Sequence, residues 1–544
     1  MSYSFEDRKK NIEKLKSEEF DLLIIGGGIS GAGVARDAAS RGMKVALVEA
    51  NDYSSGTSSR SSKLVHGGIR YLENYEFGLV FEALRERRNL FDMAPHLVHP
   101  LRFCLPLYKG GRVGMFLLGM GMWLYDALSL FEAPKFHERL SPKETMNRFP
   151  MMNGKDLVGS YVYSDAYMDD DRLVVETLRS AHSYGATSVN YVKATSGELS
   201  EGKLSSVEVQ DVLSGDKFNI KAKHFVSTVG PWTDIVANDL LGQWKDRMRP
   251  TKGVHLTFSR EKIPLKEAVV MISDDEKRIV FGIPRHEMVI IGTTDTDFEG
   301  DPANVKTTRE DVDYLLDVVD DYFPGANIEE KDIISSYSGV RPLVDDGSET
   351  ESKTSREHVI ISDHRNVTFL SGGKYTTYRQ MAEDTVEEVL KNFSTEDQVL
   401  WGQTDTLRPL NPKATEASIR KAHAAEEYQS GLRNVPVETV HKLVERHGEE
   451  AYDILENYLG KTRRGESQFW CLEAYHAIHS TMCLNLRDFY LRRVPLFLAE
   501  ADHGRRFLDD IAEVFKAELA LSDSEIKSQM DDLEGHLKHE MAWQ

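Results

Sequence analysis

The sequence predicts an α/β protein with three parts: a parallel sheet near the N-terminus, an antiparallel sheet inserted into the same region, and a mostly helical C-terminal domain. Three observations support this class. A strand, a glycine-rich turn and a helix follow one another near the N-terminus. Short runs rich in β-branched residues fill the middle of the chain, and helical periodicity replaces them from about residue 395. With 544 residues, the chain is long enough for two or three domains.

The N-terminal unit begins with the apolar run FDLLII at Phe20–Ile25, which is typical of a strand buried on both faces. Gly26, Gly28 and Gly31 follow at the spacing of a dinucleotide-binding turn, and a helix that ends at Gly42 leads into a second apolar strand. In that order, the three glycines allow a tight turn, close approach of the backbone to a pyrophosphate, and close packing of the helix on the strand. A Rossmann-like unit is therefore predicted.

Two further features of this unit favour a bound dinucleotide. The helix N-terminus at Ile29 and Ser30 offers free N–H groups and partial positive charge to a pyrophosphate. Glu49 ends the second strand about 20 residues after the turn, where a carboxylate accepts hydrogen bonds from ribose hydroxyls. An acid at this position disfavours the 2′-phosphate of NADP, but the unit alone leaves FAD and NAD open.

The rest of the chain divides by its periodicity. Strand patterns with turn signals occur at 186–199, 215–230, 252–258, 278–285, 288–295 and 358–373. Helical patterns occur at 415–432, 435–448, 449–460 and 468–493. We therefore interpret 395–544 as a separate helical domain, and the histidines in its acidic helices as solvated.

The bulk composition excludes some function classes. The 67 basic and 88 acidic residues give a formal charge of −21, which argues against a nucleic-acid partner. The three cysteines, Cys104, Cys471 and Cys483, are too few and too scattered for a disulfide framework or a metal site, so a reducing cytoplasmic compartment is expected. The first 20 residues lack the apolar core of a secretory signal.

The most apolar stretch is Val113–Phe131, which is long enough to raise the question of a membrane span. It contains Asp126 and three glycines, so we expect a buried or interface helix instead. A helix that docks on a membrane surface is the intermediate alternative.

The segment after the dinucleotide unit, GTSSRSSKLVHGGIRYLE at 56–73, resembles the flavin-contacting segment of respiratory FAD-dependent glycerol-3-phosphate dehydrogenases. Similar motifs follow in order at 94–106, 163–173, 227–234, 251–258, 278–285, 290–302, 311–316, 337–346 and 371–379. The resemblance spans about the first 390 residues, with the pair Arg492–Arg493 as a further match.

This resemblance implies FAD as the cofactor and a fold like that of glutathione reductase and D-amino-acid oxidase. It implies a discontinuous FAD-binding domain within 18–394, built from about 18–95, 150–235 and 335–394. A substrate-binding domain is expected at about 96–149 and 236–334, and the helical domain at 395–544.

The implied reaction oxidises the C2 alcohol of sn-glycerol 3-phosphate to dihydroxyacetone phosphate, with hydride transfer to the flavin. Such a reaction needs a base and several cations around the phosphate dianion. By resemblance, Arg70 and Lys374 grip the phosphate and Tyr71 adds a hydroxyl. Arg341 is expected to face the reacting carbon, and Arg356 to serve either end.

Two histidines compete for the role of base. His66 lies beside the flavin-contacting glycines and His255 lies on the expected substrate sheet, and the motifs leave both open. A helix that begins in GGKYTTYR would point its dipole at the flavin. The acidic runs at 168–172 and 292–297 are interpreted as a helix start and a strand-ending turn, so no metal is expected. The implied FAD contacts are Gly26, Gly28, Ile29, Ser30, Gly31, Glu49, Thr57, Ser58, Ser59, Ser62, His66, Gly67, Gly68, Gly230, Gly373, Lys374, Thr376 and Thr377.

The resemblance favours a homodimer that docks peripherally on the cytoplasmic face of a membrane and passes electrons to a quinone. The alternatives are an oxidase of the same fold that uses O2, another flavin oxidase such as a glycine-oxidase-like enzyme, and a regulatory flavin module without catalysis. The four cations argue against an amino-acid substrate, because a single carboxylate needs fewer of them.

Overall fold

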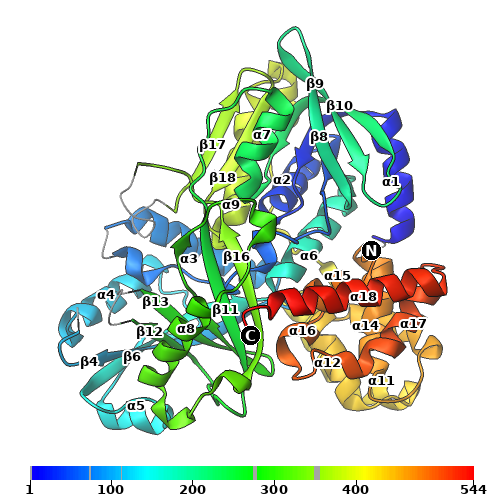
Figure 1. The fold of residues 1–544 in the computed structure, drawn as a ribbon. Helices are drawn as coiled ribbons and strands as arrows, with labels where there is room; N and C mark the ends of the chain where they lie inside the picture. Colours follow the sequence, from blue (N-terminus) through cyan, green and yellow to red (C-terminus); the bar gives the residue numbers. More distant parts are fainter. Residues whose placement is uncertain (1–2, 73–74, 112, 274–277, 348–355) are drawn as a thin grey trace.

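The computed structural model describes residues 3–72, 75–111, 113–273, 278–347 and 356–544. It contains two mixed β-sheets with helices packed on them, and a group of C-terminal helices beside both (Figure 1). The predicted α/β class, with a second sheet and a helical C-terminal part, is confirmed.

The first sheet holds the Rossmann-like unit at its centre. β1 pairs in parallel with β2 on one side and with β10 on the other, and β18 extends the parallel run beyond β10. The path through the sheet is β17, β18, β10, β1, β2 and β7. The strand bounds are β1 Glu19–Ile25, β2 Val45–Val48, β7 Thr187–Val189, β10 Lys217–Ser227, β17 His358–Asp363 and β18 Val367–Gly372.

Helices bury the two faces of this sheet. One apolar core joins the sheet to α2, α6 and α9, and another joins it to α1, α7 and the hairpin β8–β9. The sequence patterns did not predict α1. An ion pair of 2.8 Å between Arg8 and Asp211 attaches this helix to β9. The bounds are α1 Phe5–Ser17, α2 Ile29–Ser40, α6 Asp170–Ser183, β8 Val192–Ser200, β9 Lys203–Asp211, α7 Thr233–Leu241 and α9 Tyr378–Leu390.

The second sheet is mostly antiparallel, with one parallel pair between β4 and β12. Its order is β15, β11, β14, β13, β12, β4, β6 and β3, with β16 paired to β11 and β5 to β6. The bounds are β3 Leu64–Val65, β4 Val98–Tyr108, β5 Glu138–Leu140, β6 Leu157–Met168, β11 Thr251–Ser259, β12 Ala268–Ile272, β13 Ile279–Arg285, β14 Met288–Gly292, β15 Thr296–Asp297 and β16 Ile333–Arg341.

Three strands of this sheet come from ranges that the sequence assigns to the FAD-binding domain. β3, β6 and most of β16 lie within 18–95, 150–235 and 335–394, yet they pair with β4, β6 and β11 of the second sheet. A strand pattern shows only which residues alternate, so it does not reveal which of two sheets a strand joins. The division into domains itself stays a prediction.

The C-terminal helices are α10 Thr395–Leu400, α11 Glu416–Arg433, α12 Val437–His447, α13 Glu450–Tyr458, α14 Gln468–Ser480, α15 Leu486–Arg492, α16 Leu496–Ala499, α17 Leu508–Glu518 and α18 Asp523–Glu540. The single helix predicted at 468–493 is wrong, because α14 ends at Ser480 and α15 begins at Leu486. Asn485 starts the second helix by accepting a hydrogen bond of 3.0 Å from the Asp488 backbone N–H. Met482, with a φ of 50°, adopts the left-handed backbone conformation between the two helices.

The apolar stretch at Val113–Phe131 forms α4, Met115–Leu128. Its inner face is buried at Met122 and Tyr125, while Phe116 is 81% exposed and Trp123 is 63% exposed. One face of α4 is therefore buried and the other is exposed, so the interface helix and the membrane-surface helix both stay predictions. Among the helices in the described part of the chain, none is both long and apolar enough to span a bilayer.

Candidate active site

A cavity of about 1560 Å³ is lined by residues of both sheets. The sequence-predicted residues that line it are Gly26, Gly28, Ile29, Ser30, Glu49, Thr57, Ser58, Ser62, His66, Gly68, Arg70, Tyr71, Gly230, His255, Arg341, Arg356, Gly373, Lys374 and Thr376. The structure thus brings together residues that are more than 300 positions apart in the chain.

The other predicted residues lie behind the cavity wall. A Cβ on Gly31 would lie 1.9 Å from the Gly26 carbonyl oxygen, so this glycine serves helix packing, as predicted. The Gly67 N–H donates to the Tyr125 hydroxyl at 3.0 Å. The Ser59 carbonyl accepts a hydrogen bond from Lys63, and the Thr377 backbone N–H donates to the Lys374 carbonyl. These contacts brace the wall and do not face the cavity.

The dinucleotide turn has the geometry that a pyrophosphate requires. Gly26 has a φ of 109°, and a Cβ there would lie 2.8 Å from the Thr228 carbonyl oxygen. α2 begins at Ile29, and the Ser58 hydroxyl accepts a hydrogen bond of 3.0 Å from the Ile29 N–H. This glycine cradle at a helix N-terminus fits the phosphates of FAD.

Glu49 is fixed beside that turn. One carboxylate oxygen accepts a hydrogen bond of 2.7 Å from the Gly27 N–H, and the other accepts one of 2.9 Å from the Asn51 N–H. Burial raises the pKa of this carboxyl in spite of both hydrogen bonds. Each oxygen keeps a free acceptor position, which suits a ribose hydroxyl.

Two of the four predicted cations share one carboxylate. Arg341 donates to one oxygen of Asp295 at 2.9 Å, and Arg356 donates to the other at 3.2 Å. Burial alone would raise the pKa of Asp295, but Arg341 and Arg356 outweigh it and hold this pKa below its usual value. The sequence reasoning missed Asp295, because the run at 292–297 read as an ordinary turn.

Lys374 lies in the same cavity without such a partner. Its Nζ atom is shielded from solvent and has no hydrogen-bond partner among the described residues, although it lies 3.8 Å from the centre of the Tyr71 ring. Burial, with the charges of Arg70 and Arg356 nearby, lowers the pKa of Lys374 to about 7. An unpaired ammonium group in a partly buried site is costly, so this site favours an anionic ligand.

The helix predicted after Gly373 is present. A 3-10 turn at Tyr375–Thr377 leads directly into α9, so the backbone at Gly373 and Lys374 meets the cavity just before a helix N-terminus. Gly373 has a φ of 79°, a backbone conformation that residues other than glycine rarely adopt.

Both candidate bases face the cavity as neutral imidazoles. His255, on β11, has its Nε2 atom 2.9 Å from the Ser62 hydroxyl, and its ring stacks on Tyr337 at 4.7 Å. Burial, then Arg341, lowers the pKa of His255 well below its usual value.

His66 lies near other cations of the cavity than His255 does. Its backbone N–H donates to the Thr376 hydroxyl at 3.3 Å. Burial, then Lys374 and Arg70, lowers the pKa of His66 to about 3. Tyr337, which supports His255, was not predicted; only the pairing of β11 with β16 places them together.

Known proteins resemble the chain along its whole length. A family model described as FAD dependent oxidoreductase matches residues 21–379, and one described as the C-terminal domain of alpha-glycerophosphate oxidase matches 368–526. The aerobic glycerol-3-phosphate dehydrogenase of Staphylococcus haemolyticus is 33% identical over 94% of this chain and 93% of its own length. That of Staphylococcus aureus strain RF122 is 32% identical, with coverages of 98% and 97%.

Solved structures agree with these relatives. The glycerol-3-phosphate dehydrogenase from Bacillus halodurans, complexed with FAD, has a TM-score of 0.82 and 27% identity, and the match covers 99% of this chain and 98% of that one. The L-alpha-glycerophosphate oxidase from Mycoplasma pneumoniae, at a TM-score of 0.56 and 18% identity, covers 69% of this chain and 96% of its own, and shares the fold alone. With FAD as its cofactor, the chain belongs to the FAD-dependent glycerol-3-phosphate dehydrogenase family.

Proposed function

We propose that this enzyme oxidises sn-glycerol 3-phosphate to dihydroxyacetone phosphate and delivers the electrons to a membrane quinone. Bound FAD supplies the hydride acceptor. The observation that carries the proposal is Lys374, whose shielded ammonium group has no hydrogen-bond partner among the described residues and shares its cavity with Arg70, Arg341 and Arg356. The names of the relatives support the same substrate.

In the proposed complex, the phosphate dianion lies between Lys374 and Arg70. Each charge-assisted hydrogen bond from these cations strengthens binding, and the Tyr71 hydroxyl adds a neutral donor. Asp295 pairs with both Arg341 and Arg356, so these guanidinium groups are oriented before the substrate arrives. Pre-oriented donors lose little entropy on binding.

We propose His255 as the base that removes the C2 hydroxyl proton. Among the neighbouring charges, Arg341 lowers the pKa of His255 most. Lys374 and Arg70 are the charges that lower the pKa of His66. If Lys374 and Arg70 hold the phosphate, His66 lies at the phosphate end and His255 at the reacting carbon. Arg341 then stabilises the oxygen that loses its proton.

The substrate is tested by mixing the oxidised enzyme with candidate alcohols and amines in the absence of oxygen. Glycerol 3-phosphate is expected to bleach the visible absorption of the flavin as the flavin is reduced. Glycerol serves as the matched control without a phosphate, and glycine as the amino-acid control. Bleaching by glycine but not by glycerol 3-phosphate contradicts the proposed substrate.

The quinone acceptor is supported by the surface around α4. Phe116, Leu117, Met120 and Trp123 project from α4, and the Trp123 ring contacts His137, next to exposed Phe136. We call these five apolar residues the α4 surface. Contiguous exposed apolar side chains of this kind mark sites of membrane or partner contact.

α4 is also linked to the cavity wall. On its inner face, Tyr125 donates to Asp165 at 2.8 Å and accepts from the Gly67 N–H, which belongs to the flavin-side segment. In the proposed complex, a quinone leaves the bilayer at the α4 surface. It therefore approaches the cavity from the side where Tyr125 of α4 contacts the cavity wall. We propose peripheral docking through this surface on the cytoplasmic face of the membrane.

The acceptor is tested by comparing turnover with a soluble quinone analogue and with dissolved oxygen. Quinone reduction is expected to exceed peroxide formation at equal substrate concentration. One peroxide per glycerol 3-phosphate, with no faster turnover when quinone is added, assigns the enzyme to the oxidase alternative.

A further inference from the structure

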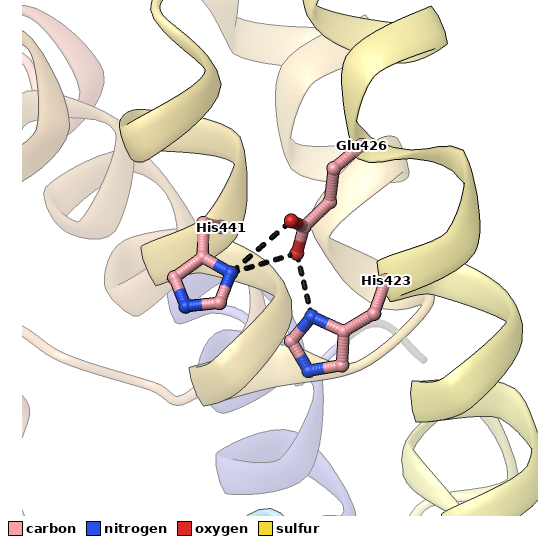
Figure 2. Close-up of side chains that lie close together, drawn as sticks. All are labelled: His423, Glu426 and His441. Atoms are coloured by element: carbon pink, nitrogen blue, oxygen red, sulfur yellow. Dashed lines mark hydrogen bonds and ion pairs between the residues drawn. The ribbon is translucent and has the colours of Figure 1, made fainter.

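A second group of potential ligands lies in the C-terminal helices, away from the cavity. His423 and Glu426 are on α11, three positions apart, so their side chains share one face of that helix. His441 is on α12, which returns alongside α11 after a turn at Asn434. Figure 2 shows the two imidazoles turned toward the carboxylate from neighbouring helices. None of the three lines the active-site cavity.

The distances within this group are those of potential ligands to one ion. The Nδ1 atom of His423 lies 2.6 Å from Glu426 Oε1, and the Nδ1 atom of His441 lies 3.1 Å from both carboxylate oxygens. One ligand atom from each residue lies within 4.8 Å of the other two. Two donors at about 2.0–2.1 Å from a tetrahedral ion are about 3.3 Å apart, so only small side-chain movements are needed.

The chemistry of the three donors selects the ion. Two imidazoles and one carboxylate, without a thiolate, suit zinc and its neighbours among the divalent transition metals. Calcium and magnesium prefer oxygen ligands throughout, so they fit poorly. The side chain of His441 is 45% exposed and that of His423 is 35% exposed, which leaves a side open for water to complete the coordination.

A second carboxylate supports His441 from behind. Glu445, one turn further along α12, lies 3.4 Å from the Nε2 atom of His441, on the opposite side of the ring from Glu426. A histidine that binds a metal through one nitrogen commonly donates its other N–H to a carboxylate.

The helices that carry the ligands are held by packing next to each ligand. Ala422, beside His423, is buried, and its carbonyl accepts a hydrogen bond of 2.5 Å from Tyr452. Val440, beside His441, is buried in the same apolar cluster. The backbone positions of the ligands are therefore fixed independently of any ion, as a preformed site requires.

We propose that His423, Glu426 and His441 bind one divalent metal ion of the zinc class, with water completing a tetrahedral shell, and that the ion clamps α11 to α12. The interpretation of these histidines as merely solvated came from the helical pattern, which does not reveal that two helices fold back on each other.

The test is a zinc titration of the full-length, FAD-loaded enzyme, pretreated with a chelator, in competition with a chromogenic zinc indicator. One zinc ion per chain is expected to bind the native protein and to raise its unfolding temperature. His441→Ala and Glu426→Gln are expected to weaken binding at least tenfold and to abolish the temperature shift. Glu445→Gln is expected to weaken binding about 10- to 100-fold, as loss of a supporting carboxylate does elsewhere.

His364→Ala is the matched control, because this histidine is 87% exposed and pairs only with a neighbouring aspartate among the described residues. Circular dichroism and flavin content check that each variant is folded. Glycerol 3-phosphate turnover is expected to be unchanged in all of them. If the native protein takes up no zinc, or if the double variant His423→Ala/His441→Ala binds as well as the native protein, the proposal is wrong.

Discussion

At the scale of single residues, Lys374 is a group of the cavity whose charge changes near neutral pH. Its pKa of about 7 reflects burial first and then the charges of Arg70 and Arg356, partly opposed by Glu76. The ammonium charge is therefore present below about pH 7 and lost above it. Phosphate binding restores the charged form, since an anion nearby raises the pKa of a lysine.

We expect kcat/KM for glycerol 3-phosphate to fall as the pH rises through about 7, by up to tenfold per pH unit. Lys374→Arg should remove this decline, because a guanidinium group stays charged across the range. Initial rates from about pH 6 to pH 9 measure both enzymes. An unchanged decline in the arginine variant assigns the titration to another group.

The two histidines should differ in which kinetic constant they control. His255→Gln is expected to lower the rate of flavin reduction at saturating substrate by about 10²- to 10⁴-fold, the usual contribution of a general base. His66→Gln should chiefly raise KM, because His66 adjoins the expected phosphate site. Stopped-flow reduction without oxygen measures the two effects separately. If His66→Gln lowers the rate of flavin reduction and His255→Gln chiefly raises KM, then His66 is the base and His255 adjoins the phosphate.

The sequence motifs name residues that line this cavity, but not the contacts that orient them. Arg341 and Lys374 lie in segments whose sequence resembles motifs of the glycerol-3-phosphate dehydrogenase family. Asp295 has no such signal: its role exists only because the turn after β14 meets the end of β16. The same holds for Tyr337, whose place opposite His255 follows from strand register.

At the scale of elements, the first turn of α2 tolerates no side chain at Gly31. The Cβ of Gly31→Ala would overlap the Gly26 carbonyl at 1.9 Å, which forces α2 away from β1 and opens the pyrophosphate cradle. We expect this variant to be purified with little or no FAD. Flavin absorbance per protein is the measurement.

Gly535→Ala in α18 is the control for that experiment. A Cβ there meets no atom within 4 Å, and alanine stabilises a helix interior by about 0.5–1 kcal/mol relative to glycine. This control should therefore retain full FAD. Equal flavin contents in the two variants would mean that the turn adapts to a side chain.

A buried group of ion pairs lies at the end of α15, the helix that follows the break after α14. Asp52, in the loop after β2, accepts hydrogen bonds from Arg492 at 2.7 Å and from Arg493 at 2.9 Å. Burial alone would raise the pKa of Asp52, but Arg493 and Arg492 outweigh it and hold the pKa below its usual value. The helical periodicity at 468–493 could not predict this contact, because Asp52 lies over 400 residues earlier in the chain.

Asp52→Asn should lower the free energy of unfolding by about 3–5 kcal/mol, because it removes the carboxylate that the buried Arg493 pairs with and leaves Arg492 with Asp488 alone. Thermal unfolding followed by circular dichroism measures the loss, with the exposed Asp531→Asn as control. The stabilisation is present above the unfolded pKa of the aspartate and disappears as the pH falls through its folded pKa. The two variants should therefore converge in acid, and a gap that persists there contradicts this account.

At the scale of the whole molecule, the α4 surface should determine membrane binding separately from catalysis. Phe116→Glu/Trp123→Glu places two charges on the proposed docking face, and a charge that must enter the bilayer costs roughly 2–3 kcal/mol or more at depth. We expect the variant to lose sedimentation with vesicles of phosphatidylethanolamine and phosphatidylglycerol. Its reduction of a soluble dye by glycerol 3-phosphate should stay unchanged.

Val399→Glu provides the control, because Val399 is 80% exposed but lies on α10, outside the α4 surface. This variant should sediment like the native enzyme. If both variants bind vesicles equally well, the membrane contact lies elsewhere.

The position of β1 in the middle of the first sheet has a consequence for biosynthesis. β1 and β2 leave the ribosome early, but β10, the other neighbour of β1, ends only at Ser227, and β18 follows at Val367–Gly372. At about 5–20 residues per second, the open side of β1 stays unpaired for roughly 10 to 40 seconds of translation. An unpaired apolar strand can pair with other chains. Chaperones that cover the nascent N-terminal third should therefore raise the yield of folded enzyme.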